Sequence, residues 1–142
     1  MSLVLDASMA LAWQFKRADP AEAVLADKAL EELSSAQAAV PAIWYAEVAS
    51  GLLRGERQGV IPPTQTAYFL NELSQADIVA DEISTRARQV SVLDLARTYG
   101  LTAYDATYLE LAMRRAAILA TFDRKLAEAA RAAGVRVFGD AG

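Results

Sequence analysis

The stretch Leu3-Val4-Leu5-Asp6-Ala7-Ser8 sets the pattern that decides the fold. Three apolar residues are followed at once by an acid, and small residues then begin a helical pattern. A short, uniformly apolar run of this kind is typical of a strand that is buried on both faces of a parallel sheet. The stretch therefore predicts a buried strand over Leu3–Leu5, with Asp6 at its carboxyl end.

Short apolar runs alternate with longer helical patterns along the rest of the chain. Further strands are expected at Ala39-Val40, Ile78–Ala80, Ile118–Ala120 and residues 135–138. Helices are expected over about residues 8–16, 20–34, 42–58, 62–75, 83–99, 102–116 and 124–133. This alternation favours the α/β class, and right-handed crossovers then give an α/β/α sandwich around a short central parallel sheet.

Length and composition restrict the chemistry. A chain of 142 residues is the usual size of a single domain, so one domain over residues 1–142 is expected. The net charge of −4 disfavours a basic, electrostatically driven DNA binder. The chain contains no Cys and no His, which excludes thiol and imidazole catalysis and ordinary structural zinc. Any catalysis must therefore use carboxylates, hydroxyls, Lys or Arg.

The sequence also predicts that the chain does not cross a membrane. Its longest charge-free stretches, 33–46 and 58–71, have fourteen residues each, whereas a spanning helix needs about 20. The N-terminus has no basic segment of the kind that begins a signal peptide. A cytoplasmic location is therefore expected.

Several acids fall where a doubly wound sheet binds ligands, which is outside the carboxyl ends of its strands. Asp6 follows the first strand, and Thr121 and Asp123 follow the strand at Ile118–Ala120. Asp105 begins the helix that feeds that strand, so helix start and strand end can meet at one edge. A helix N-cap is an alternative explanation for Asp6, Asp105 or Asp123 taken singly.

Glu47 is unusual among the helical acids. Its neighbours three and four positions away are apolar or small: Ile43, Trp44, Ser50 and Gly51. A charge on such a face needs a partner, because burying it alone costs several kcal/mol, by general estimates roughly 3 or more. The alternative is a boundary glutamate that reaches solvent.

A cluster of these acids would need a cation. Like charges raise one another's pKa, and a hard divalent ion with oxygen ligands relieves the repulsion. Mg²⁺ or Mn²⁺ suits an all-carboxylate site. Such a site activates water for phosphodiester hydrolysis, and no His is then needed as the base.

At these residues the sequence resembles the PIN domain, and within it the VapC-type toxin ribonucleases. The resemblance covers nearly the whole chain and rests on four segments in order: Val4-Leu5-Asp6-Ala7-Ser8, Trp44-Tyr45-Ala46-Glu47-Val48, Tyr104 to Ala112, and Leu119 to Leu126. Each segment is a weak signal alone, whereas four in order make a fairly specific match.

The resemblance implies roles for particular residues. It makes Asp6, Glu47, Asp105 and Asp123 the catalytic, metal-binding acids, with supporting hydroxyls from Thr121 and Ser8. It further implies Mg²⁺ or Mn²⁺ as cofactor, endonucleolytic cleavage of RNA, a homodimer, and neutralisation by a cognate antitoxin protein.

Basic residues near these acids are candidates for phosphate or RNA contacts. Arg124 and Lys125 follow Asp123, and Arg54 lies two turns beyond Glu47. Arginine is well shaped for phosphate, although a solvated face is the alternative. Three other charged residues are expected at the surface, without a special role: Asp81, Glu110 and Arg114.

Other functions use similar acids. A haloacid-dehalogenase-like phosphotransferase requires Asp-x-Asp after its first strand, but Ser8 is at the position of the second Asp. A receiver domain requires two adjacent acids after that strand and a Lys after a strand late in the chain, and neither is present. Two alternatives stay open, namely a catalytically silent α/β interaction module and a non-toxin PIN nuclease of RNA processing.

Overall fold

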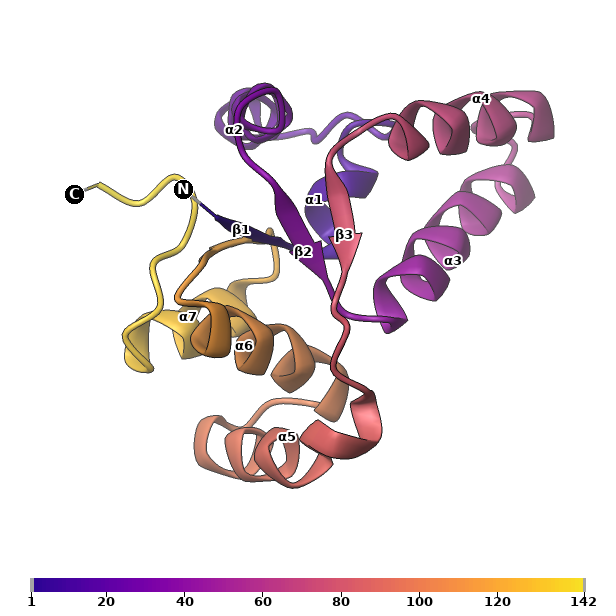
Figure 1. The fold of residues 1–142 in the computed structure, drawn as a ribbon. Coiled ribbons are helices and arrows are strands. Elements are labelled where there is room, and N and C mark those ends of the chain that lie inside the picture. Colours follow the sequence, from indigo (N-terminus) through magenta and orange to yellow (C-terminus); the bar gives the residue numbers. More distant parts are fainter. Residues whose placement is uncertain (1, 142) are drawn as a thin grey trace.

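Four parallel strands form one central sheet in the computed structural model, which describes residues 2–141. The strands are β1 (Leu3–Leu5), β2 (Ala38–Val40), β3 (Ile78–Ala80) and β4 (Ile118–Ala120), in the order β3-β2-β1-β4. Figure 1 shows β1, β2 and β3. All three neighbouring pairs are parallel. The predicted α/β architecture with a short parallel sheet is confirmed.

Helices cover both faces of the sheet. They are α1 (Ala7–Leu11), α2 (Pro20–Glu32), α3 (Ile43–Arg57), α4 (Pro63–Ser74), α5 (Thr85–Tyr99), α6 (Ala103–Arg115) and α7 (Arg124–Ala132). In Figure 1, α5, α6 and α7 lie on one side of the sheet, with α2, α3 and α4 on the other. Helix α6 packs directly on the strands, and α5 and α7 pack against α6.

The buried strands are those that the sequence marks as uniformly apolar. Every residue of β1, β2 and β4 is buried. Strands β1 and β2 have neighbours on both sides, and residues 136–138 bond to Leu119 along the outer side of β4. Strand β3 is at the sheet edge, where Val79 is 36% exposed. Asp6 and Thr121 therefore directly follow strands in the best-buried part of the sheet.

The first helix is shorter than expected. A helix over residues 8–16 was predicted, but α1 ends at Leu11 and a turn follows. Tertiary contacts explain the early end: the Trp13 indole Nε1 donates to the Ala26 carbonyl at 2.9 Å. The Phe15 ring packs so closely on Gly55 that a Cβ there would lie 2.5 Å from it. These contacts anchor a turn over residues 12–14, after which the Phe15 N–H still donates to the Leu11 carbonyl at 2.8 Å.

The strand predicted at residues 135–138 is reduced to one parallel bridge, between Leu119 and Val137. The Leu119 N–H donates to the Arg136 carbonyl at 2.9 Å, and the Phe138 N–H donates back to Leu119 at 2.8 Å. Gly139 then adopts a φ of 97°, which turns the chain away from the sheet. Too few residues remain alongside β4 to form a ladder.

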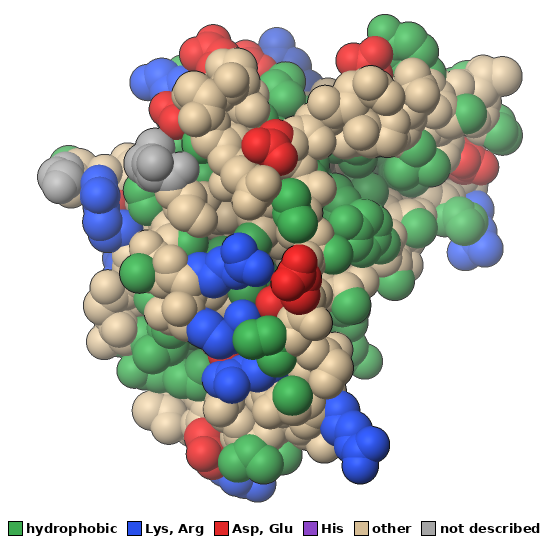
Figure 2. All heavy atoms as spheres, viewed as in Figure 1, with side chains coloured by type: hydrophobic (Ala, Val, Ile, Leu, Met, Phe, Trp, Pro, Cys, Tyr) green, Lys and Arg blue, Asp and Glu red, His purple; other side chains and the backbone are tan. Residues whose placement is uncertain are grey.

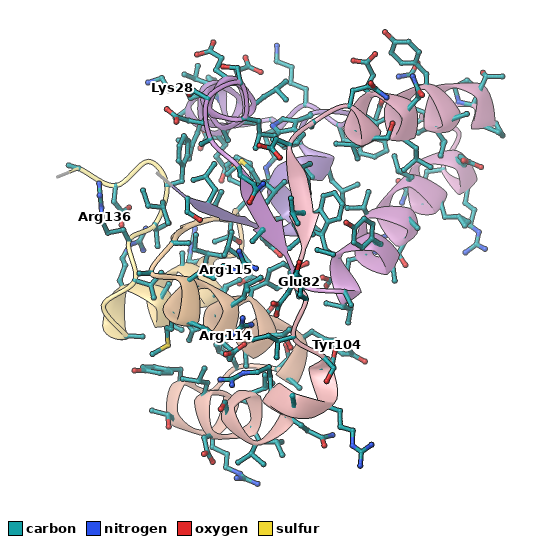
Figure 3. The ribbon with its side chains drawn as sticks, viewed as in Figure 1. Lys28, Glu82, Tyr104, Arg114, Arg115 and Arg136 are labelled. Carbon is teal, nitrogen blue, oxygen red and sulfur yellow. The ribbon has the colours of Figure 1, made fainter. Side chains whose placement is uncertain are left out.

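Glu110, Asp81 and Arg114 belong to a network of ion pairs, whereas the sequence predicts separate positions at the surface. Glu110 is only 4% exposed and accepts from Arg88 and Arg114, each at 2.9 Å. Arg114 also pairs with Asp81 at 2.5 Å, and Figure 3 shows it reaching from α6 toward the segment after β3. The surface expectation is wrong for these residues, because α5 and β3 bring partners that lie far away in the sequence.

Within residues 2–141, no helix has both the length and the apolar character required to traverse a lipid bilayer.

Candidate active site

The turns that follow β1 and β4 lie side by side. The two strands pair in parallel with Leu5 opposite Ala120, so both end at the same edge of the sheet. The Asp6 N–H donates to the Ala120 carbonyl at 3.0 Å, which joins the two turns at their first residue. The turns bring Asp6, Thr121 and Asp123 together, as their positions after the strands predict.

Two hydroxyls fix the Asp6 carboxylate. The Ser8 hydroxyl donates to Asp6 Oδ2 at 2.5 Å, and the Thr121 hydroxyl donates to the same oxygen at 2.7 Å. Each hydroxyl also accepts a backbone N–H, Ser8 from Phe122 and Thr121 from Asp123, both at 2.9 Å. These bonds lock the two turns together, and the position of Asp6 relative to β4 is fixed.

Asp6 does not act as a simple helix cap. It occupies the N-cap position of α1, yet its side chain makes no capping hydrogen bond. The side chain is buried, and this burial raises the pKa of Asp6 above its ordinary value. The Ser8 and Thr121 hydrogen bonds oppose the rise, while the negative charge of Asp123 adds to it. The bonds therefore hold a buried acid beside another acid.

Asp105 lies in the first turn of α6, where Thr102 supplies the cap. The Thr102 hydroxyl accepts from the Asp105 N–H at 3.1 Å, which leaves the Asp105 carboxylate for other contacts. Partial burial is the largest cause that raises the pKa of Asp105, followed by the charges of Asp123, Asp6 and Glu47, and together they bring it to about 6. The four acids therefore converge closely enough to affect one another.

Asp123 is both a cap and a neighbour of Asp6. Its Oδ1 accepts the Leu126 N–H at 2.9 Å at the start of α7, so the capping explanation is confirmed for this residue. Its charge nevertheless raises the pKa of both Asp6 and Asp105. A capping role and membership of the acidic cluster therefore coexist in this side chain.

Glu47 enters the cluster from α3 and has a partner that sequence reasoning missed. The Tyr108 hydroxyl donates to Glu47 Oε1 at 2.5 Å. Burial raises the pKa of Glu47, the Tyr108 bond lowers it, and the charge of Asp6 raises it. Burial and the Glu47 bond also raise the pKa of Tyr108 well above its usual range, so the phenol stays a donor. Tyr108 lies three residues after Asp105, and this helical spacing was the available signal.

The donor set suits a hard divalent cation. Carboxylate and hydroxyl oxygens line the site. The pKa values of Asp6, Glu47 and Asp105 are raised first by burial and then by the charges of neighbouring acids, and a cation would offset both effects. Within residues 2–141, no three acidic side chains are close enough to form a complete metal cage. Mg²⁺ does not require one, because it usually keeps several waters and takes one or two carboxylates. The residues present therefore fit such an ion.

The basic candidates differ in their placement. Arg124 lines an open groove of about 350 Å³ together with Thr121, Phe122 and Asp123. Lys125 is exposed on α7. Arg54 is exposed farther along α3 and lines a separate groove with Arg57, so it is not brought to the acids. Arg17, which sequence reasoning passed over, lies 4.6 Å from the centre of the Phe122 ring.

Comparison with known proteins places this chain in a family. The family model for the PIN domain matches residues 3–132. The chain therefore belongs to the PIN domain family, whose members are typically metal-dependent nucleases. No curated protein sequence matches the chain closely enough to count as a relative.

Two solved structures share the fold. PAE2754 from Pyrobaculum aerophilum is 23% identical, with a TM-score of 0.66 over 91% of this chain and 87% of that one. FitAcB from Neisseria gonorrhoeae is 22% identical, with a TM-score of 0.58 over 98% of this chain and 97% of that one. At these identities the likeness shows the fold alone.

Replacing Asp105 with Asn is expected to stabilise the metal-free protein at pH 7. The folded chain raises the Asp105 pKa from 3.8 to about 6, so it holds this proton more tightly than the unfolded chain does. Stability therefore falls as pH rises through that window, and the whole penalty is present at pH 7. Because the side chain is partly solvated, we expect a gain of only about 1 kcal/mol.

Urea unfolding in chelator at pH 7 and pH 4.5 measures this effect. The advantage of Asp105→Asn over the wild type should be present at pH 7 and should shrink at pH 4.5. If the variant is less stable than the wild type at pH 7, the main effect of the Asp105 charge is to stabilise the N-terminal end of α6.

Proposed function

We propose that this chain is a metal-dependent endoribonuclease that hydrolyses RNA phosphodiester bonds, with residues 1–142 as a single nuclease domain. The observation that carries the proposal is the shared end of β1 and β4, where hydrogen bonds through Thr121 join Asp6 to the turn of Asp123, with Asp105 near enough for the charges of Asp123, Asp6 and Glu47 to raise its pKa. These four acids come from four distant parts of the sequence. Membership of the PIN family agrees with a nuclease.

Mg²⁺ or Mn²⁺ is the proposed cofactor, and its chemistry when bound is to lower the pKa of a water and neutralise charge on a phosphate. Asp6, Glu47, Asp105 and Asp123 are the proposed catalytic acids and candidate ligands, of which the ion would take one or two carboxylates directly and the rest through its bound waters. Ser8 and Thr121 act through Asp6, because their hydrogen bonds hold its Oδ2 and leave the carboxylate no free rotation.

RNA is the proposed substrate, and few base contacts are needed, since attack is at the backbone. Arg124 stands beside Asp123 in the open groove, where its guanidinium can bind a phosphate. Lys125 is a second candidate for such a contact. Arg54 is not proposed, because it lines a different groove.

A toxin role in a type II toxin–antitoxin pair is proposed from the resemblance of the sequence to VapC-type ribonucleases. It brings with it a cognate antitoxin protein, a homodimer and a cytoplasmic location. Exposed apolar residues are available for such partners on α3 and α4: Tyr45 is 50% exposed, Tyr68 60% and Leu70 46%.

Incubation of the purified protein with total RNA tests the proposed function. Cleavage should require Mg²⁺ or Mn²⁺, stop on chelation, and give internal cuts when the ends are mapped. RNA that stays intact with either metal present, or cutting that continues in chelator, would contradict the proposal.

A further inference from the structure

Tyr108 is the largest fully buried side chain of the described residues, and its hydroxyl is directed at the acidic site. It lies on α6, is 0% exposed, and donates to Glu47 Oε1 at 2.5 Å. A buried phenol stabilises a protein when its ring packs and its O–H finds an acceptor. Here the acceptor is a carboxylate from α3, so the bond joins the helix of Asp105 to the helix of Glu47.

Glu47 depends on this bond for its orientation. Within residues 2–141, Glu47 forms no salt bridge, and Tyr108 is its one side-chain hydrogen-bond partner. A glutamate side chain is long and loses considerable rotamer entropy when it is ordered. The phenol bond occupies Oε1, and Oε2 is then the oxygen that is free to face the site.

The arrangement parallels that of Asp6. Hydroxyls of Ser8 and Thr121 occupy one oxygen of Asp6, as the hydroxyl of Tyr108 occupies one oxygen of Glu47. Outer partners of this kind orient metal ligands, and their loss typically costs about 10–100-fold in metal affinity or activity. The chain thus uses neutral hydroxyl donors, which leave the negative charge of each acid in place.

We propose that Tyr108 is a positioning residue that holds Glu47 in the orientation needed to bind a divalent cation. This inference rests on the proposed function, because it assigns Tyr108 a task in that same site. A purely structural tyrosine is the competing explanation, since the ring is fully buried in the hydrophobic core.

Binding of Mn²⁺ to the full chain without RNA, measured by calorimetry, separates these explanations. Tyr108→Phe keeps the ring and removes the donor, and it should weaken Mn²⁺ binding at least about 10-fold. In cleavage assays the Mn²⁺ concentration for half-maximal rate should rise by a similar factor, with the KM for RNA unchanged. Tyr104→Phe is the matched control, because Tyr104 lies on the same helix and is 61% exposed (Figure 3).

A double-mutant cycle shows whether Tyr108 acts through Glu47. Once Glu47→Gln has been introduced, adding Tyr108→Phe should weaken Mn²⁺ binding little further. If the fold-loss of Mn²⁺ affinity in the double variant equals the product of the losses in the two single variants, Tyr108 does not act through Glu47, and the proposal is wrong.

A measurement on the wild type covers the case in which Tyr108→Phe does not fold. With ¹³C in the tyrosine rings, the Tyr108 Cζ resonance should shift on addition of Mg²⁺, and that of Tyr104 should stay. An unmoved Tyr108 resonance in a protein that binds Mg²⁺ would overturn the proposal.

The outcomes also separate this inference from the proposed function. A wild type that binds Mn²⁺ and cuts RNA, together with a Tyr108→Phe variant that does both equally well, removes only the role of Tyr108. A wild type that binds no Mn²⁺ removes the role and the proposed function together.

Discussion

Asp6→Asn is expected to lower metal-dependent RNA cleavage by about 10³-fold, which corresponds to about 4 kcal/mol of lost transition-state stabilisation. The variant loses one negative charge at the point where β1 and β4 end together. Asparagine keeps the shape of the side chain, and its carbonyl oxygen can still accept from Ser8 and Thr121. The fold should therefore survive while the site fails.

Cleavage rates at saturating Mn²⁺, together with a thermal melt, measure this effect. Asp94→Asn is the control, since Asp94 pairs with Arg97 at the surface, where the Asp94 side chain is 68% exposed. The control should cut RNA like the wild type. Cleavage by Asp6→Asn at more than about a tenth of the wild-type rate would remove Asp6 from the chemistry.

Glu110→Gln is expected to destabilise the fold by about 2–3 kcal/mol, although Glu110 lies outside the acidic site. The substitution removes the charge that Arg88 and Arg114 share, and Arg114 is only 19% exposed. Arg114 keeps Asp81 as a partner, so the loss should stay below that of a fully buried pair. Figure 2 shows Lys and Arg side chains gathered over this part of the molecule, and their mutual repulsion would then be less compensated.

Urea unfolding of Glu110→Gln gives this free energy directly, and the melting temperature should fall by roughly 6–9 °C. Asp94→Asn again provides the comparison, because an exposed i,i+3 pair contributes at most about 0.5 kcal/mol. Equal losses of unfolding free energy in Glu110→Gln and Asp94→Asn would show that the buried ion pairs of Glu110 are no stronger than an exposed one.

The sheet and the positions of the acids at the ends of its strands can be predicted from the sequence alone. Leu3–Leu5 and Ile118–Ala120 are uniformly apolar, and residues that directly follow parallel strands must meet at one edge. The positions of Asp6, Thr121 and Asp123 depend only on these local features, and they could therefore be predicted.

Contacts between distant elements could not be predicted in this way. Nothing near Glu110 in the sequence indicates that α5 brings Arg88 to it, or that Asp81 reaches Arg114 from the end of β3. The bond between Tyr108 and Glu47 depends on where the fold places α6 and α3 relative to each other. Each of these pairs depends on tertiary packing, which periodicity does not encode.

The basic residues illustrate the same limit. Arg124 stays beside Asp123 because the two are adjacent in the chain. Arg54 lies about 10 Å beyond Glu47 along a straight helix, by the general rise per residue, and its groove is a separate one. Adjacency in the chain keeps Arg124 beside Asp123, whereas a separation of two helical turns leaves Arg54 in a different groove from the acids.

The most direct test of the account is an anomalous difference map from crystals soaked in Mn²⁺. We expect a peak at the shared end of β1 and β4, about 2.1 Å from a carboxylate oxygen of Asp6 and from at least one of Glu47, Asp105 and Asp123. The absence of a peak among these acids at saturating Mn²⁺, or a peak only at another site, would contradict it.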